Sequence, residues 1–368
     1  MEKHAKTSVV LGQLKCQFAR LASVTAMKIL SAILTLGILG WASTAHAAIP
    51  ASQRTVLTDL FTSTNGAAWI NKTNWNGAVG TECTWFGVTC DAAQSNVVSI
   101  QLRSNNLVGT LPALSGLSAL QTFDVFGNFL TGPIPSLTGL TALQFFLVQH
   151  NQLTGAMPSL TGLTALQHFA VDFNQLTGSI PSLNTLTALR GFSAFNNQLT
   201  GAIPPLSGLT ALQFIDVTGN FGGGGNLLTG TIPSLTGLTN LSNFRVSNNQ
   251  LTGTIPSLTG LTALQIFRVN NNQLTGAIPS ITGLTALQSL DVNSNQLTGP
   301  VPAPPASLLA GQSNLCANTL TSSGVAAIDT AWNTATGVNW LACQTASPAP
   351  VCELIISHQP SPQAAAPL

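Results

Sequence analysis

The sequence predicts an extended repeat solenoid whose short units stack their strands into one parallel β-sheet. An asparagine recurs every 23 residues, and the single exception is a step of 29 from Asn220 to Asn249 that places a six-residue insertion at 221–226. A fixed period of this length is typical of stacked repeats, none of which can bury its apolar face alone. The nine recurrent residues are Asn105, Asn128, Asn151, Asn174, Asn197, Asn220, Asn249, Asn272 and Asn295.

Each unit contains the parts of one turn of such a stack. Apolar residues two apart, such as Phe267 and Val269, predict a strand with one buried face. The recurrent asparagine follows, where the chain leaves the sheet, and its amide is expected to bond backbone groups of its own and the neighbouring turn. Gly276 permits a tight bend, and Pro279 prevents a regular helix there.

The pattern Leu-x-x-Phe/Leu-x-Val-x-x-Asn-x-Leu-x-Gly-x-Ile-Pro, as from Leu287 to Val301, resembles the plant-type subclass of leucine-rich repeats. This subclass occurs in receptor-kinase ectodomains, polygalacturonase-inhibiting proteins and secreted bacterial relatives. The resemblance covers about residues 51–305 and implies an α/β repeat solenoid, a curved right-handed superhelix with its parallel sheet on the concave face. The common plant unit has about 24 residues, one more than here, so the family's curvature is not carried over.

Residues 48–96 and 306–343 are expected to cap the array of nine repeats at 97–305, because exposed end turns would show the core. In the first cap, Ser52 is expected to cap a short helix. The segment Cys83–Cys90 resembles the family's N-terminal domain, whose Cys-x-Trp-x-Gly-Val-x-Cys motif leads into the first strand. In the second cap, one amphipathic helix is expected to end near Gly337.

Cysteine usage indicates an oxidising compartment. Cys83 with Cys90 and Cys316 with Cys343 each bracket one end of the array, where disulfides are expected. Zinc is the alternative for four cysteines, but the two pairs lie at opposite ends and no neighbouring histidine completes a ligand set. Cys352 has no assigned partner and is either free or linked to another chain.

The N-terminal segment indicates export. Lys28 precedes the apolar run 29–41, and a small-x-small cleavage site ends at Ala47, so residues 1–47 are expected to be a signal region. We favour translation from Met27 over a longer basic region at 1–26. The run is too short to remain as a membrane span. The protein is therefore expected to be secreted, extracellular or at the cell surface, or periplasmic in a Gram-negative host, with a disordered proline-rich tail at 344–368.

Charge and histidine content argue against several functions. Only 6% of residues are charged, and without residues 1–47 six basic residues face nine acids. No basic patch is available for nucleic acid. His150 and His168 occupy strand positions too far apart to share a metal or a proton. We therefore expect no catalytic residues, no metal and no cofactor, and interpret the protein as non-enzymatic.

The second, fourth and sixth positions after each leading leucine are expected to face solvent on the concave side. Repeats 2 to 6 carry large apolar residues there, which predicts a contact surface for a protein or peptide. The alternative is that these residues pack on one another across strands. The residues are Phe126, Phe145, Leu147, Phe195 and Phe214, with Phe173 one position beyond.

Two further rows leave the function open. Asp216, Arg245, Arg268 and Asp291 share one strand position and form either a self-satisfied row of ion pairs or a polar recognition stripe. A threonine row on another side could bind ice or carbohydrate, although duplication of the repeat explains it more simply. Its members are Thr131, Thr154, Thr177, Thr200, Thr229, Thr252, Thr275 and Thr298.

Overall fold

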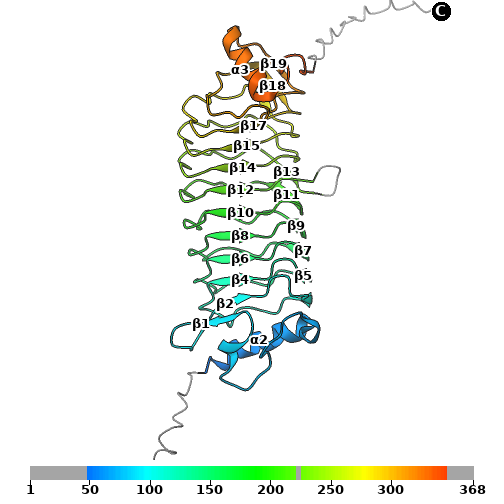
Figure 1. Ribbon diagram of the computed structural model, residues 1–368, viewed down its shortest axis with the longest axis vertical. Coiled ribbons are helices and arrows are strands. Elements are labelled where there is room, and N and C mark those ends of the chain that lie inside the picture. The colour runs from blue at the N-terminus through cyan, green and yellow to red at the C-terminus, as the bar shows by residue number, and fades with distance from the viewer. Residues whose placement is uncertain (1–47, 221–224, 346–368) are drawn as a thin grey trace, which may run out of the picture. The chain divides into compact units, whose positions relative to one another are not determined.

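A computed structural model describes residues 48–220 and 225–345, and their turns stack into a solenoid (Figure 1). The signal region 1–47 with Met27, the tail beyond residue 345 and Cys352 lie outside the described residues. None of the helices in the described residues combines the length and the apolar character that a membrane span needs. The predicted repeat solenoid is confirmed.

The larger sheet contains ten strands, of which β1 pairs antiparallel with β2 and the others are parallel. Neighbouring turns pair with residues one repeat apart opposite each other, as Phe145 lies opposite His168. The strands are β1 (Val88–Cys90), β2 (Val97–Gln101), β4 (Thr122–Asp124), β6 (Phe145–Leu147), β8 (His168–Ala170), β10 (Gly191–Ser193), β12 (Phe214–Asp216), β14 (Asn243–Arg245), β15 (Ile266–Arg268) and β17 (Ser289–Asp291).

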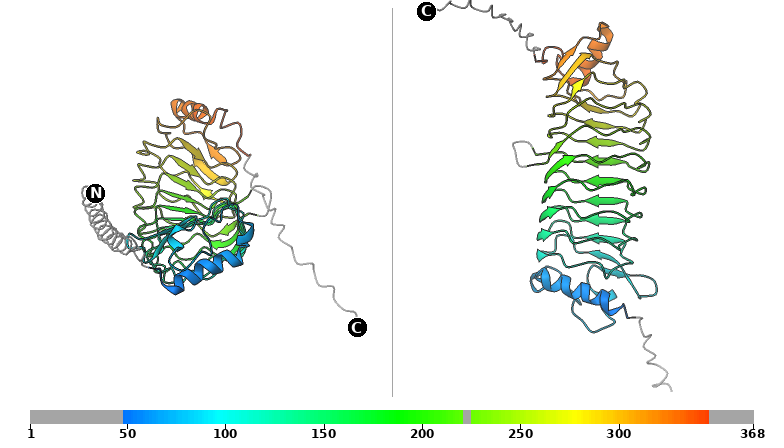
Figure 2. Two further views of the ribbon diagram at one scale, coloured as in Figure 1. Left: turned by 60° about the horizontal axis from the view of Figure 1, so that its bottom comes forward. Right: turned by 180° about the vertical axis from the view of Figure 1, so that it is seen from behind.

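A second row of parallel strands follows the asparagine of each turn and is seen from behind in Figure 2. It is divided into a six-stranded and a three-stranded sheet. The first comprises β3 (Val108–Thr110), β5 (Phe129–Pro133), β7 (Gln152–Ala156), β9 (Gln175–Gly178), β11 (Gln198–Ala202) and β13 (Leu227–Thr229). The second comprises β16 (Thr275–Gly276), β18 (Gln296–Pro300) and β19 (Thr319–Thr321).

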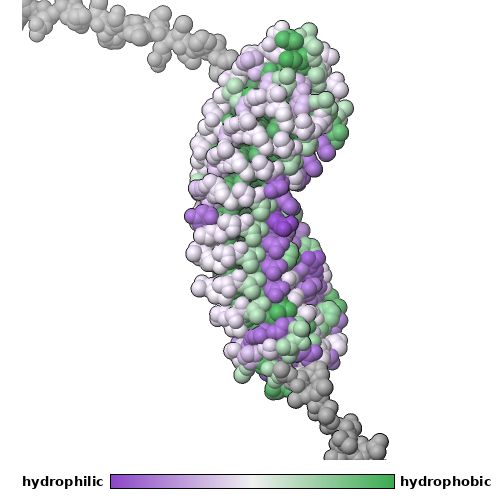
Figure 3. Space-filling view, turned by 90° about the vertical axis from the view of Figure 1, so that its left-hand side faces the viewer, coloured by the Kyte–Doolittle hydropathy of each residue, from purple (hydrophilic) through white to green (hydrophobic). Residues whose placement is uncertain are grey.

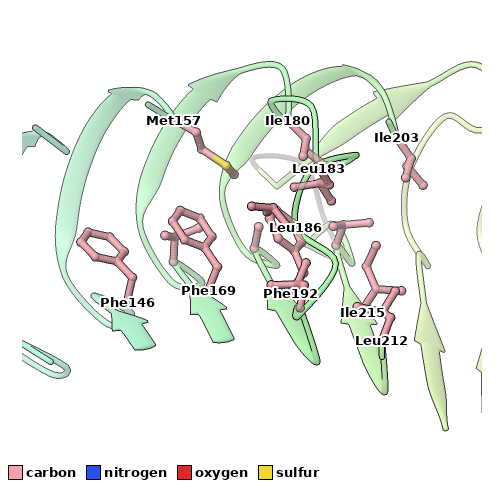
Figure 4. Close-up of a cluster of buried hydrophobic side chains, with 14 of the residues drawn as sticks. Phe146, Met157, Phe169, Ile180, Leu183, Leu186, Phe192, Ile203, Leu212 and Ile215 are labelled. Carbon is pink, nitrogen blue, oxygen red and sulfur yellow. The ribbon is translucent and has the colours of Figure 1, made fainter. Parts of the chain in front are cut away.

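The core is built from equivalent residues of successive turns. The central residue of each short strand points inward, and Phe146 stacks on Phe123 and Phe169 with ring centroids 5.7 and 5.5 Å apart. Leucine and isoleucine of the returning path close the core opposite the strands, as Leu183 and Ile180 do (Figure 4). Each turn thus buries its apolar residues against the turns on both sides, which explains why a single repeat is not stable.

The recurrent asparagines join each turn to the preceding one, as predicted. The side-chain Nδ2 of Asn174 donates to the carbonyls of Val171 and Val148 at 3.0 and 3.1 Å, while its Oδ1 accepts the backbone N–H of Leu153 at 2.9 Å. Buried backbone groups that the strands leave unpaired are satisfied in this way. The same pattern recurs from Asn128 onward, whereas the side chain of Asn105 bonds the backbone N–H and carbonyl of Asn71 in the N-terminal cap.

Asn220 was assigned wrongly to this ladder. Asn220 is exposed, and Asn226, only 1% exposed, occupies the ladder position. Its Nδ2 donates to the carbonyls of Val217 and Ala194, although Val217 lies nine residues before it and not three. The additional residues therefore precede the ladder asparagine, whereas counting 23 from Asn197 placed them after it. Residues 221–224 of the predicted insertion lie outside the described range.

The N-terminal cap begins with α2 (Ala51–Ser63), which packs Val56, Leu57 and Leu60 against the core. Ser52 does not cap this helix, as it was expected to do. Pro50 is the N-cap residue instead, because its carbonyl accepts the first helical N–H groups, from Gln53 and Arg54. Short 3-10 helices at Gly66–Ala68 and Glu82–Thr84 follow.

The C-terminal cap begins with another turn of the ladder. Asn318 lies within the segment predicted as cap and binds the carbonyls of Val292 and Leu315 as the other ladder asparagines do. α3 (Ala326–Thr336) then ends at Gly337, as predicted, with a left-handed φ of 71°. Gln344 and Thr345 were predicted to start the disordered tail. They instead bond to Leu315 and Asn318.

Both predicted disulfides are present, Cys83–Cys90 and Cys316–Cys343, one in each cap. The first disulfide lies in the segment that leads into β2. The second connects the last turn of the ladder to the residues after α3. The C-terminal cap is therefore linked covalently to the turn that it covers, whereas the first disulfide closes a short loop within the N-terminal cap.

Candidate functional site

All ten predicted binding residues lie on β4 to β17 or just after them, on the solvent side of the ten-stranded sheet. We call this side the strand face; it is the face that was predicted to be concave. The residues are less exposed than expected, because most are half-buried, and of the five predicted phenylalanines only Phe173 is classed as exposed, at 39%. The reason is that they pack on one another across the strands.

A first aromatic row runs across β6, β8 and β12. The rings of Phe145 and His168 stack with centroids 5.4 Å apart, and His168 contacts Phe214 at 5.9 Å. Gly191 occupies the equivalent position on β10, between His168 and Phe214. A Cβ there would lie 2.2 Å from the Phe214 ring and 2.7 Å from His168 Nδ1. The absence of a side chain at Gly191 thus lets the row continue across β10.

A second aromatic row runs parallel to the first, where the chain leaves the strands. His150 packs edge-on against Phe126 at 5.2 Å and stacks on Phe173 at 4.1 Å. Phe173 in turn meets Phe195 at 5.0 Å. His150 and Phe173 both adopt a left-handed φ, 55° and 51° respectively. The strand face thus carries two continuous aromatic rows.

The structure places the two histidines in different rows. Sequence reasoning considered them only as candidates for catalysis or metal binding and therefore missed that they belong to the aromatic rows. The signal was available, since His168 lies 23 residues after Phe145 and His150 lies 23 before Phe173. Burial lowers the pKa of His168, and the positive charge of Arg190 lowers it further.

Ion pairs occupy the other part of the strand face. Arg268 pairs with Asp291 at 2.9 Å and Arg245 with Asp216 at 3.8 Å, so each arginine has an acid beside it, as the sequence indicated. Burial raises the pKa of both acids, while the neighbouring arginines oppose this shift. Figure 3 shows hydrophilic patches next to hydrophobic ones along this part of the molecule.

A small pocket marks the boundary between the aromatic and the charged part. Its volume is about 230 Å³, and Phe214, Asp216, Asn243 and Arg245 line it. The Nε of Arg245 is buried and has no hydrogen-bond partner among the described residues. The pocket can therefore offer one aromatic face together with an unused donor.

The second row of strands presents a different surface. Its six-stranded sheet carries no charged residue, and the predicted threonine row lies on its outer side and continues onto β16 and β18. Thr131 is half-buried and the other seven threonines are exposed. Among the described residues, no group of three or more His, Cys, Asp or Glu side chains is placed to hold a metal ion.

Comparisons with known proteins agree with this architecture. The family model for the leucine-rich repeat matches residues 286–308. The leucine-rich-repeat ectodomain of the plant membrane receptor kinase GASSHO1/SCHENGEN3 from Arabidopsis thaliana, in complex with CASPARIAN STRIP INTEGRITY FACTOR 2, is 32% identical with a TM-score of 0.63. That match covers 73% of this chain and 33% of the ectodomain.

Two further solved structures are similar. The plant peptide hormone receptor RGFR1 in complex with RGF2 is 33% identical with a TM-score of 0.55, and the match covers 61% of this chain and 36% of the receptor. A plant ice-binding protein is 22% identical with a TM-score of 0.57, over 84% of this chain and 99% of that protein, which shows a shared fold.

The chain spans about a third of the length of the two receptor chains that it matches. The 23-residue ladder, the family model and the receptor ectodomains all agree on the same repeat. The chain is therefore built from leucine-rich repeats, which are similar to those in the ectodomains of plant receptor kinases.

Proposed function

We propose that the chain is a secreted, non-enzymatic recognition protein that binds a protein or peptide through its strand face. The observation that carries this proposal is the pair of aromatic rows across β4 to β12. Half-exposed aromatic side chains that are held rigidly by their neighbours are the usual anchors of protein interfaces. The two disulfides support secretion, because such bonds persist in oxidising compartments.

The rows favour an extended ligand. They run across the strands, so a ligand that follows the rows lies along the axis of the stack. Strands are about 4.8 Å apart, and four steps from β4 to β12 span about 19 Å, the length of about six extended residues. The GASSHO1/SCHENGEN3 and RGFR1 structures are complexes with named ligands, the second of a peptide hormone receptor, which supports a peptide as ligand here.

Affinity capture from the native environment tests the proposal. The double variant Phe145→Ser with Phe214→Ser removes two anchors of the first row, and we expect it to lose the partner that the unmodified protein captures. Phe129→Ser is the matched control, because Phe129 is 52% exposed on β5 of the six-stranded sheet, away from the strand face. Equal capture by a folded double variant would reject the strand face as the binding site.

A surface for carbohydrate or ice is the second candidate function. It is favoured by the uncharged six-stranded sheet, on which a row of exposed threonines recurs once per turn. A periodic and uncharged surface fits a regular, uncharged ligand. Thermal hysteresis and polysaccharide pull-down test it, with Thr177→Lys and Thr200→Lys as the disrupting variant. If the intact protein shows neither thermal hysteresis nor polysaccharide binding, this candidate is rejected.

A further inference from the structure

The strand face contains an acid that lacks the arginine partner that the other acids of this face have. Three acids of this face each form an ion pair with an arginine: Asp124 with Arg103, Asp216 with Arg245 and Asp291 with Arg268. Asp172 forms no ion pair with any of the described residues, although it is only 7% exposed. A carboxylate that is buried without a cation is costly, so its environment calls for an explanation.

The surroundings of Asp172 compensate its charge only in part. Burial raises the pKa of Asp172, whereas a hydrogen bond from the Ser193 hydroxyl and the charge of a protonated His150 act in the opposite direction. Asp216, the other charged group near it, has the same sign and raises the pKa further. The carboxylate is therefore held where its charged form is disfavoured by the protein alone.

An acceptor without a hydrogen-bond partner lies one turn before Asp172. Gln149 occupies the same position as Asp172 one turn earlier, and its side-chain Oε1 is buried without a hydrogen bond among the described residues. Neighbouring strands are about 4.8 Å apart, so one ligand group can reach both oxygens. An unpaired buried acceptor costs about 1–3 kcal/mol, and such an oxygen beside a carboxylate that forms no ion pair indicates a site that a positively charged donor completes.

Aromatic residues flank Gln149 and Asp172 in the array. Phe126 and Phe195 occupy the same position on the turns before Gln149 and after Asp172. The stacked rings of His150 and Phe173 follow the two residues directly in the chain. Aromatic faces attract cations, most strongly where water is partly excluded.

We propose that Asp172 and Gln149 form a subsite for the positively charged nitrogen of a lysine or arginine side chain of the ligand. Ammonium and guanidinium groups carry several N–H donors and no acceptor, which matches two neighbouring acceptor side chains flanked by aromatic residues. A metal ion fits less well, because the hard cations prefer several oxygen ligands and only one carboxylate is present. The inference rests on the proposed function and names the chemistry of one part of the partner.

Small analogues of the two side chains test the subsite without knowledge of the partner. n-Butylammonium and n-propylguanidinium are titrated into the intact protein, with n-butanol as the uncharged control, while the side-chain amide resonance of Gln149 is followed by NMR. We expect a saturable shift with at least one cation and none with n-butanol. Asp172→Asn is expected to weaken cation binding about tenfold, since it removes a charge-assisted hydrogen bond.

Asp59→Asn is the matched control, because it removes the same charge from an exposed position on α2 and leaves the subsite intact. Its affinity for the cations should equal that of the unmodified protein. Absence of a saturable shift with both cations, or equal binding by Asp172→Asn, overturns the subsite. Either result leaves the wider proposal standing if capture of the native partner still depends on Phe145 and Phe214.

Discussion

The side-chain Oδ1 of Asn226 accepts the backbone N–H of Leu199 at 3.0 Å, across a segment that contains the additional residues of the sixth repeat. The ladder is therefore continuous through the insertion, and the exposed Asn220 is not part of it. We expect Asn226→Ala to lower the free energy of unfolding by about 2–4 kcal/mol, because several buried backbone groups lose their partner.

Asn220→Ala is the control for this substitution. It should change the free energy of unfolding by less than about 0.5 kcal/mol, as exposed substitutions usually do. Urea unfolding followed by circular dichroism measures both variants. Equal destabilisation by the two would contradict the assignment of Asn226 to the ladder.

Gly191→Ala tests the continuity of the first aromatic row. The added Cβ would overlap the far edge of the Phe214 ring, which can rotate toward solvent, so we expect a stability loss of only about 1 kcal/mol. Phe214 should however leave His168, and the Cε1 proton of His168 should lose the part of its ring-current shift in NMR spectra that Phe214 causes, while the stacking on Phe145 remains. An unchanged His168 resonance would show that the row does not need the space at Gly191.

Asp172→Asn is expected to stabilise the free protein. A raised pKa in the folded state means that the charged carboxylate opposes folding at neutral pH and that this penalty falls as the pH is lowered through the folded pKa. At pH 7 the free energy of unfolding of the variant should exceed that of the unmodified protein by an amount on the order of 1 kcal/mol. The difference should disappear near pH 4, and thermal unfolding at both pH values measures it. A variant less stable at pH 7 would show that the carboxylate contributes to the fold.

His168 gives the opposite dependence on pH. Its pKa lies below the usual 6.5, so below pH 6.5 the unfolded chain binds a proton that the folded chain does not. Stability is therefore lost as the pH falls from 6.5 toward the folded pKa. His168→Gln removes this contribution, and its melting temperature should fall less between pH 7.5 and 5.5. Parallel decreases in both proteins would count against the packing of a neutral imidazole.

The two disulfides should differ in their contribution to stability. Cys316 and Cys343 are 27 residues apart, whereas Cys83 and Cys90 are 7 apart. In the chain-entropy view the longer loop stabilises by about 1 kcal/mol more. Serine double variants of each pair, compared by urea unfolding, test this expectation. A larger loss for the shorter loop would point to cap packing as the main effect.

The sequence predicted the stack, its inward residues and both disulfides because each depends on a local pattern that repeats. Phe146 and Asn174 have the same environment as their equivalents one turn away, so one unit predicts all of them. Asn226 escaped prediction because the insertion can be placed on either side of an asparagine, and only the hydrogen bonds distinguish the two placements.

The strand face was predicted less completely. Alternation identified which residues point outward, but not that Phe145 and Phe214 would meet His168 across the space that Gly191 leaves. The importance of Asp172 was also missed, because the absence of a cation near an acid depends on every neighbouring turn. Such contacts form between side chains of different repeats, so the sequence of a single repeat does not indicate them.

The asparagine ladder has a direction, since every asparagine satisfies the turn before it and relies on the turn after it. At the last turn, Gln344 Oε1 receives the N–H of Leu320 at 3.4 Å, where the next asparagine would otherwise be. The two ends are thus not interchangeable, and the middle is modular. Excision of one complete unit, such as 151–173, should leave the asparagine hydrogen bonds at every junction equivalent. The length of the array can therefore change, in evolution or by design, by whole repeats.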